Sequence, residues 1–406
     1  MRLIEDQQSE LQEVLGLAES WLHELKLGAD LSYGPPALEE AEEAIRQLLK
    51  RAESDLLSVA MFGGSSSGKS FLASGLLGGL EFLRVDSVEG VPSDKYLGLL
   101  PFATTPTTMC PARVVPAKDN SIDAAGRGFM RVRFIGSGES EWEDIGNSPA
   151  PAVVAAYAMF KADVANRRRE HMQKEVAEIE IIFSDSLLPA RLYDLPGYGT
   201  VNPNHERIAK EATAAADCFI YVANATRALT ANAKDLELIR FLYEHHTLTR
   251  KRVVWVLTAI DKAMDLNIED EPSWKETLAA NNDYLRQNFT HQDGRPDTAF
   301  IGPGFIPVSP ALEAQGRFFI DAGDEARGQT LIAASNMEDL RMTLKALIAE
   351  GAGQRHLADI AQRQWVKGVR ARRADGDVVT LRDLPASACP APAGAGQADS
   401  AEITLL

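Results

Sequence analysis

Residues 63–70 read G-x-x-x-x-G-K-S, a spacing of glycine, lysine and serine that can hold the phosphates of a nucleotide. In such a loop, backbone N–H groups surround the α- and β-phosphates, the Lys reaches the β- and γ-phosphates, and the last Ser ligates Mg²⁺. An apolar run, residues 56–62, precedes the loop and an apolar helix start follows it, so a chance Gly/Ser-rich surface turn is the weaker interpretation. The residues expected to bind phosphate are Gly63, Gly64, Ser65, Ser66, Ser67, Gly68, Lys69, Ser70 and Phe71.

A second candidate segment, residues 194–197, reads D-L-P-G and ends the apolar stretch 190–193. In a nucleotide switch, an Asp in this position holds a water of the Mg²⁺ shell, and the Gly offers its N–H to the γ-phosphate. A D-x-P-G turn is common by itself, but behind a phosphate loop it favours a functional role. Asp194 is therefore expected at the metal and Gly197 at the nucleotide.

A third segment, residues 100–108, carries four threonines and two prolines. A GTPase switch uses a threonine to cap Mg²⁺ and to position the attacking water. Thr108 is the expected metal ligand, with Thr105 second, because Thr108 stands just ahead of a predicted strand start at Arg113. For any single threonine, a plain Thr/Pro linker is an equal alternative.

The segment T-A-I-D, residues 258–261, follows the apolar stretch 253–257 and predicts a base site. Asp261 stands where an aspartate accepts the N1–H and 2-amino groups of guanine, and Thr258 begins the segment. The usual pattern is [NT]-K-x-D, whose lysine stem packs over the base. Ala259 replaces that lysine, which predicts weaker base stacking.

A last candidate, Ser309, follows the predicted strand 305–308. The sequence S-P-A resembles a loop that contacts the guanine O6 through backbone N–H groups. Pro310 has no N–H to donate, so the contact is expected from Ala311 or Leu312.

Taken in order, these segments resemble the dynamin superfamily, and the bacterial dynamin-like proteins in particular. The resemblance covers about residues 40–350. Besides the phosphate loop, it rests on L-L-P at 99–101 before the Thr-rich segment, on the strand, loop and strand that lead to D-L-P-G-Y-G at 194–199, on Ala216-Asp217, and on A-L-T at 228–230.

The resemblance implies a Mg²⁺-dependent GTPase that needs no exchange factor, binds GTP and GDP, and forms a homodimer across its nucleotide face. It also implies coupling of hydrolysis to a helical stalk that remodels membranes, and so a cytoplasmic protein placed peripherally at a membrane. In such enzymes the residue matching Ser66 often holds a monovalent cation, K⁺ or Na⁺. The residue matching Ser65 orients the attacking water in some members, which carry a glutamine there. The implied catalytic residues are Ser65, Ser66, Lys69 and Thr108.

The remaining composition fits a reducing, soluble setting. Three cysteines lie far apart, without disulfide or zinc spacing, and no apolar run is long enough to span a bilayer. The net charge of −16 argues against nucleic acid as a partner.

The fold class predicted from the alternation of apolar runs and helical stretches is α/β: a P-loop GTPase domain with a mainly parallel sheet flanked by helices. The expected divisions are an N-terminal helical segment (1–55), the GTPase domain (56–318) with a helical insertion (148–177), C-terminal helices (319–373) that form a short neck with the first segment, and a disordered low-complexity tail (374–406). Seven strands are predicted, at 57–62, 130–135, 179–183, 190–193, 219–222, 253–257 and 305–308.

Two other functions stay open. A regulatory or scaffold protein could bind nucleotide with little hydrolysis, which Ala259, the short side chain of Ser65 and a C-terminus too short for a stalk favour. An ATP-dependent kinase would explain the phosphate loop and leave Asp194 and Asp261 without a role, so it ranks last. A partner chain that supplies the stalk is a further expectation.

Overall fold

The computed structural model describes residues 56–64, 66–88, 91–102, 110–117, 126–138, 141–159, 163–195, 213, 216–231, 233–249 and 251–349, together with three short strands after residue 369. The chain divides into two units: Leu56–Glu350 forms one, and Met1–Asp55 with Gly351–Leu406 forms the other. The predicted N-terminal helices, residues 350–369 of the expected neck and residues 103–108 of the Thr-rich segment lie outside the described residues.

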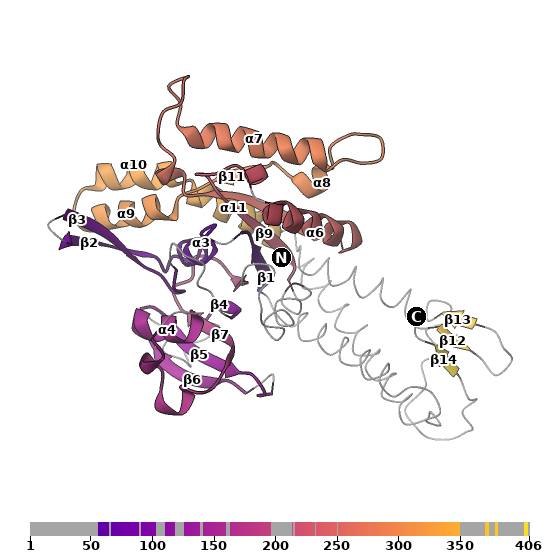
Figure 1. The fold of residues 1–406 in the computed structure, drawn as a ribbon, viewed down its shortest axis with the longest axis horizontal. Helices are drawn as coiled ribbons and strands as arrows, with labels where there is room; N and C mark the ends of the chain where they lie inside the picture. Colours follow the sequence, from indigo (N-terminus) through magenta and orange to yellow (C-terminus); the bar gives the residue numbers. More distant parts are fainter. Residues whose placement is uncertain are drawn as a thin grey trace. The chain divides into compact units, whose positions relative to one another are not determined.

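A nine-stranded sheet is the centre of the first unit in the part of the chain that is described (Figure 1). In spatial order it consists of β11 (Phe305–Pro307), β10 (Arg252–Thr258), β9 (Cys218–Asn224), β1 (Leu57–Phe62), β8 (Ala190–Asp194), β4 (Ala112–Pro116), β7 (Val176–Phe183), β5 (Phe129–Phe134) and β6 (Glu143–Asn147). The strands from β11 to β8 are parallel. β4 is antiparallel to β8, β7 runs parallel to β4, and β5 and β6 continue antiparallel.

This arrangement confirms the predicted α/β class, and each of the seven predicted strands is present with small shifts of its ends. Because β1, β8, β9 and β10 are parallel, their carboxyl ends meet at one edge of the sheet, where ligands bind in open α/β folds. The phosphate loop, Asp194 and the segment 258–261 all follow or end these strands. The topology therefore brings the predicted site segments together at one edge of the sheet.

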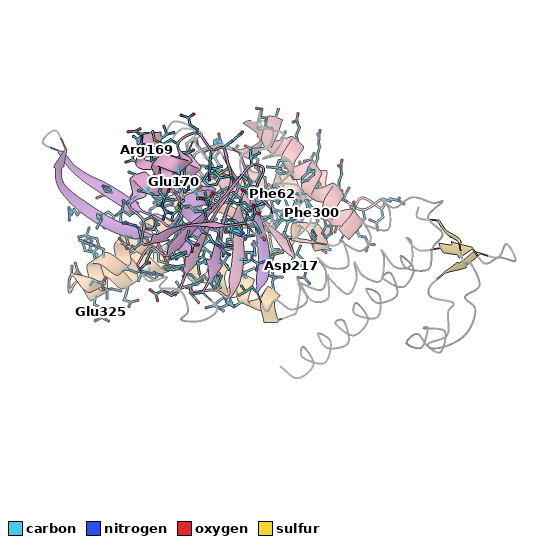
Figure 2. The ribbon with its side chains drawn as sticks, turned by 90° about the horizontal axis from the view of Figure 1, so that it is seen from below. Phe62, Arg169, Glu170, Asp217, Phe300 and Glu325 are labelled. Carbon is cyan, nitrogen blue, oxygen red and sulfur yellow. The ribbon has the colours of Figure 1, made fainter. Side chains whose placement is uncertain are left out.

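The central strands β1, β9 and β10 are buried on both faces. All six residues of β1 are buried, and Ala60 and Phe62 belong to a core shared with β9, β10 and the helices α6 (Ala233–Thr249), α7 (Ser273–Asn288) and α8 (Thr298–Ile301). Figure 2 labels Phe62 and Phe300 of this core. Successive side chains of a strand point to opposite faces, so Val59 and Met61 point to the other layer, which holds the phosphate-loop helix α3 (Lys69–Leu76). Large side chains buried in this way each contribute about 1.5–3 kcal/mol.

Two elements after α3 were not predicted from the sequence: β2 (Glu81–Val88) and β3 (Val91–Leu97), which pair as an antiparallel hairpin. The hairpin packs on α9 (Pro310–Asp321), near α10 (Glu325–Ser335) (Figure 1). α9 crosses the boundary drawn at residue 318, and α10 and α11 (Met337–Ala349) belong to the same unit. Of the helices expected over 319–373, α10 and α11 are present in the described residues.

The helices α9 and α10 approach each other at two glycines. A Cβ on Gly316 would lie 2.7 Å from the Gly328 carbonyl oxygen, and a Cβ on Gly328 would lie 2.6 Å from that of Gly316. Their backbones therefore touch, and only glycine fits at the crossing.

The predicted helical insertion 148–177 was wrong for most of its described length. α4 covers Pro151–Ala158, and only single 3₁₀ turns follow, at Val164–Asn166 and Arg169–His171, before β7 begins at Val176. Arg167 and Arg168, between these turns, donate to the carbonyls of Ala156 and Ile145 at 2.6 and 2.9 Å. Ala156 lies in the last turn of α4 and Ile145 in the edge strand β6, two places where backbone carbonyls need a partner from outside the helix or sheet.

The second unit contains a small antiparallel sheet of β12 (Arg370–Arg372), β13 (Val378–Thr380) and β14 (Glu402–Thr404). β13 and β14 fall in the tail expected to be disordered, so that expectation was wrong for these two segments. Both carry β-branched residues, which favour strands. The low-complexity composition of the tail as a whole gave no indication of these two short strands.

Candidate functional site

The phosphate loop leaves β1 and enters α3 through two positions that require glycine. A Cβ on Gly63 would lie 2.3 Å from the carbonyl oxygen of Val222 in β9. Gly68, the N-cap residue of α3, has φ +93°, in the left-handed region that favours glycine. The loop therefore passes tightly against the neighbouring strand and then turns into the helix.

Lys69, Ser70 and Asp194 meet at the end of this loop. The Lys69 ammonium donates to the carbonyls of Gly63 and Gly64 at 2.9 and 3.2 Å. The Ser70 hydroxyl donates to the Asp194 carboxylate, which is 2% exposed. Residues 124 positions apart are thus joined directly, as expected if both serve one metal site.

Burial dominates the electrostatics of this pair of charges. Burial raises the pKa of Asp194 above its usual value, opposed by the nearby Lys69 and the Ser70 hydrogen bond. Burial also lowers the pKa of Lys69, opposed by the charges of Asp194 and Asp235. Each group is buried at a cost that an added ion or phosphate would offset.

The donor atoms fit Mg²⁺, a hard cation that takes oxygen ligands and is often held by one or two carboxylates together with substrate phosphates. Ser70 supplies a hydroxyl and Asp194 a carboxylate at the same point. Among the described residues, no group of three or more His, Cys, Asp or Glu side chains could hold a metal by itself. A metal here would depend on the phosphates for further ligands.

Thr258, the last residue of β10, packs against the phosphate loop. Its buried hydroxyl donates to the Ser67 carbonyl at 2.7 Å and lies 3.0 Å from the Ala223 carbonyl of β9. A Cβ on Gly68 would lie 3.4 Å from the same hydroxyl oxygen. This residue, predicted at the nucleotide, therefore connects the base segment to the phosphate loop.

Asp261 and Ser309 are brought together from two strands. The Ser309 hydroxyl donates to Asp261 Oδ1 at 2.6 Å and accepts from the Leu312 N–H at 3.1 Å, which makes Ser309 the N-cap of α9. Ala259 between the strand and Asp261 adopts φ +60°, uncommon for a residue other than glycine. The side chain of Asp261 is therefore held in place by Ser309, which follows β11.

Two side chains beside the loop were missed in the sequence. The Asn224 amide, at the end of β9, donates to the Ser66 carbonyl at 3.4 Å. Asp235 of α6 lies beside Gly64: a Cβ on Gly64 would be 2.5 Å from Asp235 Oδ1. The position of Asn224 at the carboxyl end of a strand next to β1 is the signal that could have identified it.

The structure places the other predicted residues as follows. Ser66 is exposed, with φ +59°, and Ser67 is buried. The Phe71 ring packs on Tyr96 and Phe102, with centroids 5.4 and 4.8 Å apart. Ser65, Thr108 and Gly197 lie outside the described residues.

Comparison with known proteins gives matches only among solved structures. No family model matches the chain, and no curated protein does. Two structures of an oligomerised bacterial dynamin pair, described as sensing and tethering membranes over long range, match at 16% and 15% identity with TM-scores of 0.44 and 0.46; they cover 88% and 89% of this chain and 54% and 46% of theirs. LeoA, a bacterial dynamin GTPase from ETEC, matches at 13% identity with a TM-score of 0.35, over 90% of this chain and 49% of its own.

The chain thus spans about half the length of these three structures. Within the described residues, no helix has both the length and the apolar character needed to cross a membrane.

Proposed function

We propose that this chain is a Mg²⁺-dependent GTPase that binds GTP and hydrolyses it to GDP and phosphate. The observation that carries the proposal is the direct hydrogen bond between Ser70, at the end of a G-x-x-x-x-G-K-S loop, and the buried Asp194 at the end of β8. Asp261, held by Ser309 at the end of a neighbouring parallel strand, supplies a base acceptor at the same sheet edge.

In this proposal the backbone of residues 63–70 binds the α- and β-phosphates. Lys69 exchanges the carbonyls of Gly63 and Gly64 for the β- and γ-phosphates, which carry a full charge and accept stronger hydrogen bonds. Ser70 and Asp194 would hold Mg²⁺, which when bound offsets charge on the phosphate oxygens. The transition state of phosphoryl transfer is loose, so catalysis rests on positioning and electrostatic stabilisation rather than on a covalent step.

Asp261 provides guanine preference in the proposal. Its carboxylate accepts the N1–H and 2-amino protons of guanine, which adenine does not offer in that arrangement. Ser309 orients the carboxylate, and the N–H of Ala311 or Leu312 would contact O6. Since Leu312 already donates to Ser309 Oγ, Ala311 is the better candidate.

Further roles follow from the motif resemblance and remain part of the proposal. Thr108 would ligate Mg²⁺ and position the attacking water, and Gly197 would contact the γ-phosphate. Ser65 would lie near the attacking water and Ser66 near a K⁺ or Na⁺ ion. The chain would form a homodimer across its nucleotide face and act in the cytoplasm at a membrane, with a stalk partner.

The test is hydrolysis by the purified full-length chain with GTP and ATP, with Mg²⁺ or EDTA, in potassium and in sodium buffer. GTP turnover should exceed ATP turnover, require Mg²⁺ and fall at least about a hundredfold in Lys69→Ala. Lys275→Ala, which removes an exposed lysine on α7, is the matched control and should retain wild-type turnover. Equal or faster ATP turnover, or full activity of Lys69→Ala, would refute the proposal.

The alternative is a nucleotide-binding regulatory or scaffold protein, which Ala259 favours because its methyl group cannot cover the base as a lysine stem does. Tight, Mg²⁺-dependent GTP binding without turnover, even at protein concentrations at which dimers form, would select this function.

A further inference from the structure

The two ends of the proposed ligand are fixed by separate parts of the fold. Its phosphates lie on residues 63–70, and its base reaches Asp261, which Ser309 holds at the start of α9. The nucleoside must therefore pass between the first turn of α3 and the start of α9. The side chains that line this passage decide how firmly the base is held.

An aromatic cluster lies between these two helices. Tyr96 of β3 packs edge-on against Phe71 in the first turn of α3, with centroids 5.4 Å apart, and packs at a tilt against Phe82, with centroids 5.3 Å apart. Phe102 contacts Phe71 from another side at 4.8 Å. All these rings surround the small apolar cluster of Leu80, Phe82 and Ala314, the last on α9.

Tyr96 is held from the α9 side as well. The Gln315 amide donates to the Tyr96 hydroxyl at 2.7 Å, and Gln315 is six residues along α9 from Ser309. The hairpin is also tied to α3 where it ends, since the Leu100 N–H donates to the Ser74 hydroxyl at 3.3 Å. The ring is thus positioned by contacts on both helices.

The charge of Asp261 acts on Tyr96. The pKa of Tyr96 is raised to about 12, first by burial and also by the carboxylates of Asp94 and Asp261. The half-buried ring is joined through Gln315 to α9, whose N-cap residue Ser309 also holds Asp261.

We infer that Tyr96, with Phe71 beside it, forms the apolar wall that covers the purine ring, in place of the lysine stem that Ala259 lacks. The inference rests on the proposed nucleotide function and adds the β2–β3 hairpin to the binding site. A π-face stacks on any base, so the wall gives affinity for purines, while Asp261 gives the preference for guanine.

The experiment measures binding of GDP, and separately of inorganic tripolyphosphate, to the full-length wild type and to Tyr96→Ala, Tyr96→Phe and Tyr284→Ala. Tripolyphosphate uses the phosphate loop and has no base, so it reports the loop alone. Tyr284 packs against Phe289 in the other aromatic cluster and controls for loss of a tyrosine. Circular dichroism and melting temperature check that each variant is folded.

Tyr96→Ala should weaken GDP binding on the order of tenfold and leave tripolyphosphate binding unchanged. Tyr96→Phe keeps the ring and should stay within about twofold of wild type for both ligands, as should Tyr284→Ala. Unchanged GDP affinity in Tyr96→Ala, an equal loss for GDP and tripolyphosphate, or an equal loss in Tyr96→Phe would overturn the wall. A wild type that binds tripolyphosphate but no GDP would overturn the proposed function as well.

Discussion

The Thr258 hydroxyl donates a 2.7 Å hydrogen bond to the carbonyl of Ser67, and this bond joins the base segment to the phosphate loop. Both residues are buried, so the Ser67 carbonyl would lose its partner without regaining water if the hydroxyl were removed.

Thr258→Val should therefore loosen the phosphate loop. We expect binding of GTP, GDP and tripolyphosphate to weaken by the same factor, roughly five- to tenfold for a hydrogen bond of about 1 kcal/mol. Thr258→Ser restores the hydroxyl and should recover most of the affinity. Competition binding against a fluorescent GDP measures all three ligands. A loss confined to the ligands with a base would mean that Thr258 acts on the base and not on the loop.

A second prediction concerns Arg341 of α11, which is 3% exposed and pairs with the buried Glu313 of α9. Its guanidinium also donates to the carbonyls of Leu76 and Gly75 at the end of α3, both at 3.2 Å. Among the described residues, Arg341→Leu leaves Glu313 with the partly exposed Arg317 as its ionic partner. The free energy of unfolding should fall by about 3–5 kcal/mol.

Thermal and urea unfolding measure this effect. Lys345→Ala, on the same helix, breaks only an exposed pair with Glu338 and should cost less than about 1 kcal/mol. Equal melting temperatures for the two variants would show that the buried ion pair does not hold α3, α9 and α11 together.

A third prediction concerns His171, fully buried between two polar groups. One ring nitrogen lies 2.7 Å from the Tyr157 hydroxyl and the other 2.8 Å from a Glu143 oxygen. The Tyr157 oxygen also accepts from the Arg168 N–H, so a ring nitrogen that accepts from Tyr157 and one that donates to Glu143 satisfy these groups. His171→Phe should cost about 1–3 kcal/mol and His171→Asn less.

Amide hydrogen exchange on β5 and β7 would locate this loss, since Phe134 of β5 packs on the His171 ring. His291→Phe, which changes an exposed histidine, should leave exchange on β5 and β7 unchanged. Equal protection in His171→Phe and wild type would contradict a structural role for this network.

The sheet and much of the site could be predicted because both follow from local signals. Short apolar runs predict buried strands, and the carboxyl ends of parallel strands share one edge, so the sequence places Lys69, Asp194 and Asp261 at the same edge. What the pattern could not give is contact between distant side chains. Thr258 was expected at the ligand, and its hydrogen bond to Ser67 depends on the register of β10 beside β9.

The β2–β3 hairpin was missed for a different reason. Its residues mix charged and apolar types, and Pro92 within β3 removes a ladder donor, so the segment does not read as a strand. Arg341 was missed because it stands beside Leu340 and Leu344 on an amphipathic helix, where an arginine is normally exposed. Burial of a charge depends on partners that come from elsewhere in the chain.

The final prediction concerns pH and Mg²⁺. A metal ligand must be deprotonated, and burial places the pKa of Asp194 above that of an ordinary aspartate. Acidification should therefore weaken Mg²⁺-dependent GDP binding at a pH above the usual aspartate range. For the metal-free protein the sign is opposite: the folded state binds the proton more tightly than the unfolded chain, so the contribution of Asp194 to stability is greatest at low pH and is lost as pH rises through its raised pKa.

The increase in melting temperature caused by Mg²⁺ with GDP, measured from about pH 7.5 down to about pH 5, should shrink in wild type. In Asp194→Asn it should be small at every pH. An increase in Asp194→Asn as large as that in wild type would show that Asp194 does not bind the metal.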